Sequence, residues 1–174
     1  MQLNVRTAGD TPAERRAATD LQASVAELDL TTWLFTPDVI IEENAIPHSH
    51  PVLTLGTRNG GVFQLASLLH EQIHWFCVAN YADVQRVWDE LLRRYPDAPV
   101  GRPEGAADAE STYLHLIVCW LELDALTRLI DRETAERVAA GAMRAGLYRW
   151  IYQTVMADRE SLGELLRSYS LCIS

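Results

Sequence analysis

The residues with the clearest chemical potential are two histidines and a glutamate in the sequence LLHEQIHWF. His70 and His74 are four residues apart, so in a helix their imidazoles project from the same face, one turn apart, and can bind one ion. Glu71 lies about 100° around such a helix from His70, near enough to reach a water on that ion without being a ligand. Zinc lowers the pKa of such a water towards ~7, and a neighbouring carboxylate can then accept its proton. The pattern therefore predicts metal-assisted hydrolysis.

The segment around these three residues supports the same interpretation. The turn Arg58-Asn59-Gly60-Gly61, with Asn59 as a helix cap, precedes a stretch that is apolar on most sides up to about Val78, which is typical of a central, buried helix. A buried helix does not tolerate two histidines and a glutamate without partners. The alternative is a pair of core histidines that are hydrogen-bonded to the backbone or to a carboxylate. We favour metal binding over this alternative.

At His70, Glu71 and His74 the chain resembles the zincin superfamily of metallopeptidases. The resemblance extends to the order of a strand, 52–57, that leads into the motif helix. It implies a zinc cofactor, a peptide or small amide substrate, and an edge strand beside the helix that holds extended peptides by β-addition. The glycine and third histidine that metzincins carry soon after the motif are absent, because WFCVAN follows. A gluzincin-like layout, with the third ligand on a later helix, stays open.

Two residues compete for the third ligand position. Glu110 begins the later helix, as the third-ligand glutamate does in gluzincins, but EGAADAES is acidic and turn-like, and a glutamate in a first helical turn is also favoured by the helix dipole. His115 lies within the apolar run LHLIV, where an imidazole without a partner would be costly. We favour His115 as the ligand. Cys119 and Glu122 follow His115 by four and seven residues and lie on the same face of the expected helix. Glu122 could orient an imidazole by accepting a hydrogen bond from its second nitrogen.

Other polar residues are candidates for substrate or transition-state contacts. His48 and His50 alternate, so they point the same way if their segment is extended, although surface histidines in a proline turn are the simpler explanation. Tyr148 and Tyr152 are one helical turn apart and could offer a phenol to a developing oxyanion; we select Tyr148 as a catalytic candidate beside Glu71. Arg149 could bind a carboxylate or lie in solvent.

Two alternatives to a zinc hydrolase remain. Two histidines and one carboxylate form the facial triad of non-haem iron enzymes, so Glu110 as the third ligand would favour iron. The other alternative is a non-catalytic interaction protein whose structural metal, or His-Glu network, only braces the core.

The elements that position these residues follow from periodicity and turn signals. We expect a small N-terminal β-sheet followed by a helix bundle that carries the HExxH helix, an α+β fold dominated by helix. The expected strands are 2–7, 32–35, 38–43 and 52–57, the last three at sheet edges or strand ends because of nearby prolines. The expected helices are 11–28, 59–78, 82–95, 108–130, 132–144, 147–157 and 159–168. Asp131 and Asp158 stand at expected helix N-caps. The loop 96–107 either covers a site or joins two helices.

Length and composition set the remaining limits. The chain has 174 residues, of which 48% are hydrophobic and 22% charged, as expected for one globular domain spanning 1–174. Its formal net charge is -9 and its 15 basic residues are all arginine, which argues against a nucleic-acid partner and against attachment to anionic membrane. Three cysteines without a CxxC pair predict reduced thiols. No signal peptide or transmembrane run is apparent, so we expect a cytoplasmic protein; its oligomeric state stays open.

Overall fold

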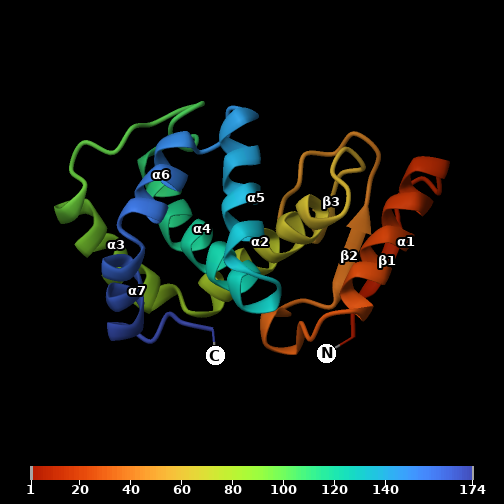
Figure 1. Ribbon diagram of the computed structural model, residues 1–174, viewed down its shortest axis with the longest axis horizontal. Helices are drawn as coiled ribbons and strands as arrows, with labels where there is room; N and C mark the ends of the chain where they lie inside the picture. Colours follow the sequence, from red (N-terminus) through yellow and green to blue (C-terminus); the bar gives the residue numbers. More distant parts are fainter. Residues whose placement is uncertain (1, 174) are drawn as a thin grey trace. The chain divides into compact units, whose positions relative to one another are not determined.

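The computed structural model describes residues 2–173, and the chain forms two compact units, Met1–Phe76 and Cys77–Ser174 (Figure 1). The boundary falls inside one helix, α2 (Val62–Ala79), which begins in the first unit and ends in the second. Each unit has its own set of elements, a small sheet with helices in the first and helices alone in the second. The organisation of 1–174 as a single domain stays a prediction.

The first unit is built around a sheet of three parallel strands. These are β1 (Asn4–Thr7), β2 (Asp38–Ile41) and β3 (Leu53–Leu55), in the order β1-β2-β3. Neighbouring parallel strands need a crossover connection, and α1 (Pro12–Ala26) provides it between β1 and β2 and packs against both (Figure 1). Val39, Ile41 and Leu53 are fully buried in the sheet, and Leu21 is buried on α1. The sheet thus forms at the expected strands 2–7, 38–43 and 52–57, each slightly shorter than predicted.

The start of α1 depends on a buried carboxylate, Glu14. The Thr11 hydroxyl accepts a hydrogen bond from the Glu14 amide, and the Glu14 carboxylate accepts one from the Thr11 amide, which together form a capping box. The same carboxylate accepts from the amides of Gly9 at 2.8 Å and Glu43 at 2.9 Å. These donors, Glu43 first, lower the pKa of Glu14 below its ordinary value. Glu14 therefore ties α1 to the chain that leaves β2.

Two buried glutamines fix α2 within the first unit. Gln64 donates to the Ala17 carbonyl of α1 at 3.1 Å. Gln72, between the two motif histidines, accepts from the amides of Phe35 and Thr36 and donates to the Thr36 carbonyl, at 2.7, 2.9 and 2.8 Å. The apolar residues of α2 that are buried are Leu65, Ala66, Leu68, Leu69, Ile73, Phe76 and Cys77, as expected for a central helix.

Two local predictions in this unit are wrong. Residues 32–35 do not form a strand: Thr31–Trp33 is a 3-10 helix, η1, and the two amides that follow bond to Gln72 rather than to a neighbouring strand. Asn59 does not cap α2, because the helix begins at Val62 and the side-chain amide of Asn59 donates to the Ser67 hydroxyl at 3.0 Å.

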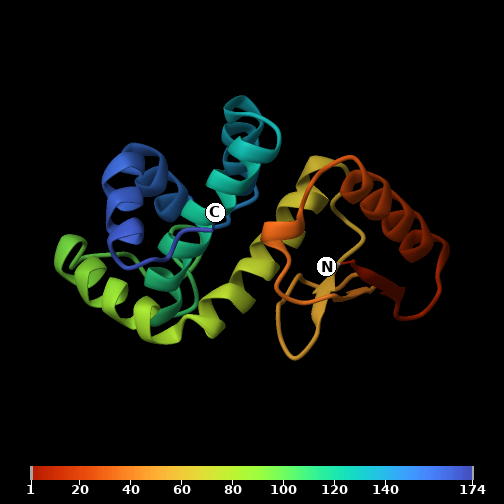
Figure 2. The same cartoon turned by 90° about the horizontal axis from the view of Figure 1, so that it is seen from below.

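The second unit is entirely helical among its described residues. It contains the C-terminal end of α2, then α3 (Tyr81–Arg94), α4 (Ala109–Leu129), α5 (Arg132–Arg144), α6 (Arg149–Ala157) and α7 (Arg159–Ser168). The helix α4 contacts α3, α5, α6 and α7 (Figure 2). Most of its side chains are buried. The predicted fold class, α+β with helix dominant and the sheet first, is confirmed at this level.

Helix starts in the second unit follow the sequence signals in part. Asp108 and Asp131 cap α4 and α5 by accepting from the amides of Ser111 and Thr134. Asp158 makes no cap hydrogen bond, because its carboxylate accepts from the Tyr95 hydroxyl at 2.7 Å instead. The helix expected from 147 begins at 149.

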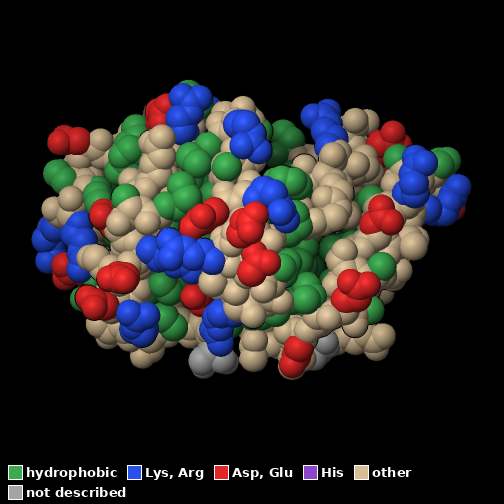
Figure 3. All heavy atoms as spheres, in the orientation of Figure 1, with side chains coloured by type: hydrophobic (Ala, Val, Ile, Leu, Met, Phe, Trp, Pro, Cys, Tyr) green, Lys and Arg blue, Asp and Glu red, His purple; other side chains and the backbone are tan. Residues whose placement is uncertain are grey.

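The surface carries both signs of charge. On the face drawn in Figure 3, arginine side chains alternate with acidic ones and with apolar atoms. The three cysteines are free thiols, and burial raises the pKa of Cys77 to about 12. None of the helices within residues 2–173 combines the length and apolar character needed to cross a membrane.

Candidate metal centre

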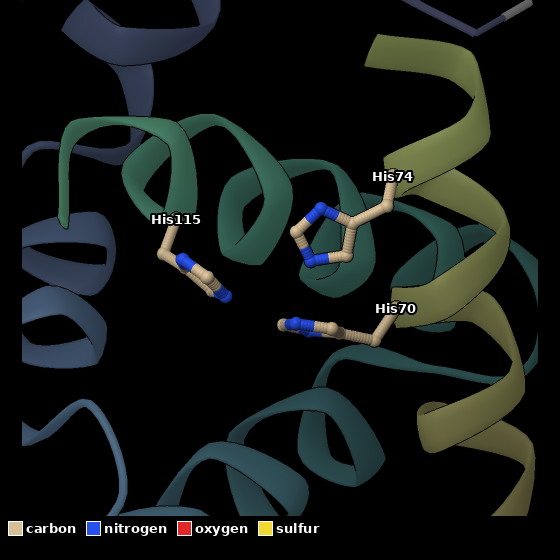
Figure 4. A group of neighbouring side chains, drawn as sticks. All are labelled: His70, His74 and His115. Atoms are coloured by element: carbon tan, nitrogen blue, oxygen red, sulfur yellow. The ribbon is translucent and has the colours of Figure 1, made fainter. Parts of the chain in front are cut away.

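The two motif histidines lie on consecutive turns of α2. Their ring centroids are 5.1 Å apart and the ring planes are inclined by 63°. Figure 4 shows both imidazoles leaving the same side of the helix. Neither side chain is in the exposed class. The spacing of four residues in a helix therefore gives the paired arrangement that the sequence predicts.

His115 lies on α4 and is buried, with 7% of its surface exposed. Its Nδ1 is 2.6 Å from the carbonyl oxygen of Ser111, one turn earlier, and 3.3 Å from the Ser111 hydroxyl. A carbonyl oxygen only accepts hydrogen bonds, so Nδ1 carries the proton. In the neutral imidazole the lone pair is then on Nε2, which is the form that binds a metal ion.

Among residues 2–173, two groups of side chains have the composition and spacing to hold a metal ion. In the first, one ligand atom from each of His70, His74 and His115 lies within 4.8 Å of the other two (Figure 4). The second group, with the same limit, combines His70 with Cys119 and Glu122. Three neutral imidazoles are a common donor set for zinc and also suit copper, iron and nickel. The first group contains the three residues that the sequence analysis selects as ligands.

The competing ligand, Glu110, lies elsewhere. It is in the first turn of α4, its side chain is exposed, and it belongs to neither group. Its position matches the simpler sequence interpretation, an acidic residue that favours the positive end of a helix.

A buried polar cluster follows His115 along α4. Glu122 is 2% exposed and accepts a hydrogen bond from the Tyr152 hydroxyl at 3.0 Å. Burial raises the pKa values of the Tyr152 phenol and the Cys119 thiol. Tyr152, one of two phenols considered for an oxyanion, instead donates to Glu122.

Tyr148 stands beside His115. The two ring centroids are 4.3 Å apart and the planes are inclined by 37°. Tyr148 has φ 50° and ψ 40° at the N-cap of α6, a left-handed conformation that is costly for a bulky residue. This conformation, together with Gly146 at φ 72°, explains why the helix starts at Arg149 rather than 147.

The loop 96–107 holds the start of α6. The amides of Arg149 and Trp150 donate to the carbonyls of Pro103 and Glu104 at 2.9 and 3.1 Å. The Arg149 guanidinium forms an ion pair with the Glu104 carboxylate at 3.0 Å. The loop thus supplies the acceptors that the first amides of the helix need, and it joins two helices as an ordered segment. Arg149, considered as a carboxylate-binding residue, pairs with Glu104.

Glu71 is buried on α2, with 6% of its surface exposed. It follows His70 directly and belongs to neither group of candidate ligands. This placement agrees with a carboxylate that acts beside the ion rather than on it, and its catalytic role stays a prediction.

The other two histidines lie in the connection between β2 and β3. Both side chains are exposed. The Nδ1 atom of His48 is 2.9 Å from the Ile46 carbonyl oxygen, and that of His50 is 2.9 Å from the Ser49 hydroxyl. The His50 ring stacks on Trp75 with centroids 4.3 Å apart. Neither histidine belongs to a candidate metal group among the described residues.

Comparison with known proteins found no matching family model, no similar curated protein and no similar solved structure. The resemblance to zincins therefore depends on the motif residues alone.

Sequence reasoning missed three residues that shape this region. Gln72 lies inside the motif itself. A buried side-chain amide between two candidate ligands needs hydrogen-bond partners, and here it bonds to backbone groups of a distant segment. Ser111 is four residues before His115, a spacing that brings its carbonyl to the imidazole. Trp75 contacts the loop that carries His50, and no local pattern indicates this long-range pair.

Proposed function

We propose that this protein is a zinc-dependent hydrolase in which His70, His74 and His115 hold the ion. The observation that carries the proposal is the first candidate group, in which one ligand atom of each histidine lies within 4.8 Å of the others. Such spacing allows three nitrogens to reach one ion at the ~2.0–2.1 Å bond length typical of zinc and imidazole.

The chemistry of these side chains fits zinc. The Ser111 carbonyl holds the proton on Nδ1 of His115, so the side chain is set to bind through Nε2. Three protein ligands leave one tetrahedral position for water, as in catalytic rather than structural zinc sites. When bound, zinc would act as a Lewis acid that lowers the pKa of water and polarises a carbonyl.

Glu71 would serve as the general base and then as the general acid. As the neighbour of His70 on a buried stretch of α2, its carboxylate would take a proton from the attacking water and return it to the leaving amine. Tyr148, fixed in a left-handed conformation beside His115, would offer its phenol to the developing oxyanion. The substrate class would be a peptide or another amide.

The test combines metal analysis with a matched pair of variants. Protein purified without added metal is expected to carry one zinc ion per chain and to hydrolyse members of a panel of peptides and acyl arylamides. Glu71→Gln should keep the zinc and lose activity by roughly 10²–10⁴-fold, the usual contribution of a general base.

Glu110→Gln is the matched control, because it makes the same chemical change at an exposed residue of α4. It should leave zinc content and turnover unchanged. Iron in place of zinc, together with loss of the metal in Glu110→Gln, would contradict the proposal and support a non-haem iron enzyme.

A structural metal or polar brace is a second candidate function, and one observation favours it. Glu122 and Cys119 of the second group are buried, as expected for a closed site. In that case Glu71→Gln would change the stability of the protein and no catalytic rate.

A further inference from the structure

The connection between β2 and β3 contains a segment, Ala45–His50, that we call the strap. His48 pairs with Thr54 of β3 in an antiparallel bridge: the His48 amide donates to the Thr54 carbonyl at 3.0 Å, and the Thr54 amide donates to the His48 carbonyl at 2.9 Å. Further along, the Ala45 carbonyl oxygen lies so close to Gly56 that a Cβ there would be 2.3 Å from it. The strap therefore contacts β3 at Thr54 and the chain just beyond β3 at Gly56.

The strap occupies the outer side of β3. In a parallel sheet the backbone groups of successive residues point alternately to the two sides of a strand. The Leu55 carbonyl accepts from the Glu42 amide, on the side of β2, so Thr54 directs its amide and carbonyl away from β2. Both of these groups bond to His48. Although β3 is at the edge of the sheet, none of its three residues has an amide and a carbonyl that face away from β2 and are open to an added strand.

The strap is also fastened to α2 beside the candidate metal ligands. The indole nitrogen of Trp75 donates to the Ser49 carbonyl at 2.9 Å, and the His50 ring stacks on the indole. Trp75 directly follows His74 in the sequence. One short segment therefore takes up the strand edge and contacts α2 next to a proposed zinc ligand.

An extended peptide bound by β-addition needs an open strand edge. We propose that the strap closes this edge, so that the hydrolase acts on a compact amide, such as a single acylated amino acid or amino-acid amide, and not on an extended polypeptide. This inference rests on the proposed function. It narrows the substrate class from peptides and amides to compact amides.

The test compares two probes on the zinc-loaded protein: an N-acetylated amino-acid arylamide, and a long unstructured peptide blocked at both ends that contains the same residue. The measured quantity is the ratio of kcat/KM for the peptide to kcat/KM for the arylamide. The native protein should hydrolyse the arylamide and cleave the peptide at least about 100-fold less efficiently.

Two variants loosen the strap in different ways, and one serves as the control. His48→Pro removes the amide that donates to Thr54, and Trp75→Phe removes the indole donor to Ser49. Each should raise the ratio by about tenfold or more. His48→Ala keeps the backbone pair and should leave the ratio unchanged, since the His48 ring bonds only to Ile46 among the described contacts.

Two results would overturn the inference separately from the proposed function: efficient cleavage of the long peptide by the native protein, or a ratio that neither His48→Pro nor Trp75→Phe changes. Hydrolysis of neither probe by the zinc-loaded protein would contradict the proposed function and the inference together.

Discussion

The chain has five histidines, and they lie in two different settings. His48 and His50 are exposed residues of the strap, with ring nitrogens close to polar atoms within two residues. The other three lie on helices, none is in the exposed class, and their ligand atoms lie within 4.8 Å of one another. Both sets contain a closely spaced pair, so spacing alone does not distinguish them.

The difference between the two sets comes from what surrounds each pair. In the strap, both rings are exposed, and their Nδ1 atoms lie near the Ile46 carbonyl and the Ser49 hydroxyl. On α2, a spacing of four residues brings two rings together on consecutive turns, and a buried amide from Gln72 fixes the backbone between them. In the second setting three imidazoles from two helices bring their ligand atoms within 4.8 Å of one another, which is the arrangement that one shared cation requires.

The largest effect is expected from truncating the two sets in turn. His70→Ala, His74→Ala and His115→Ala should each weaken zinc binding by more than ~100-fold, since each removes a direct ligand and even residues that only orient a ligand contribute 10–100-fold. His48→Ala and His50→Ala should bind zinc like the native protein. Titration with a zinc-chelating dye measures the zinc affinity of all five variants. Equal losses of affinity in the helical and strap variants would contradict the distinction between the two sets of histidines.

A second prediction concerns the clamp inside the motif. Gln72→Leu leaves the amides of Phe35 and Thr36 and the Thr36 carbonyl without their partner, so the free energy of unfolding should fall by about 3 kcal/mol or more. Gln64→Leu is the matched control, because it removes one hydrogen bond, to Ala17, and should lower that free energy by only about 1 kcal/mol. Urea unfolding followed by circular dichroism measures the two values. Equal losses would show that the amide is not a special anchor of the histidine pair.

The buried cluster on α4 gives a smaller effect. Tyr152→Phe removes the hydroxyl that donates to Glu122 and should lower the free energy of unfolding by about 1–2 kcal/mol. Tyr81→Phe, at a residue with 59% of its surface exposed, should change it little. Thermal unfolding of the two variants provides the comparison, and an unchanged stability in Tyr152→Phe would show that Glu122 does not depend on this phenol.

The smallest effect is expected just before the strap, where Glu14 bonds to the chain that leaves β2, and it depends on pH. Glu14 bonds to the Glu43 amide just before this segment, and its pKa is lower in the folded protein than in the unfolded chain. Its contribution to stability is therefore fully present above the ordinary glutamate pKa and is lost as the pH falls through the lower folded value. Glu14→Gln should flatten the decline in stability below about pH 4.5. An acid unfolding profile with the same slope in both proteins would contradict this role.

The sequence predicted much of this arrangement because the relevant signals are local. The capping residue Asp131, the apolar length of α4 and the helical spacing of His70 and His74 are all read from a few neighbouring positions. The strand expected at 32–35 did not form: the Trp33 amide donates to the Leu30 carbonyl within a 3-10 turn, and the Phe35 amide bonds to Gln72, which is 37 residues away.

The strap was not foreseen for the same reason. A proline-rich segment with two histidines looks like a surface turn, and its pairing with Thr54 is decided by the course of the chain between two parallel strands. The T-x-x-E pattern of Thr11 and Glu14, by contrast, is a recognised capping signal that the sequence analysis overlooked.

Zinc K-edge X-ray absorption on the protein purified without added metal tests the central claim most directly. The account predicts one zinc ion per chain with three imidazole nitrogens and a light fourth atom at about 2.0–2.1 Å. A sulfur neighbour at about 2.3 Å would place the ion with Cys119 instead. Protein that contains no zinc when purified and binds none when zinc is added would contradict the account altogether.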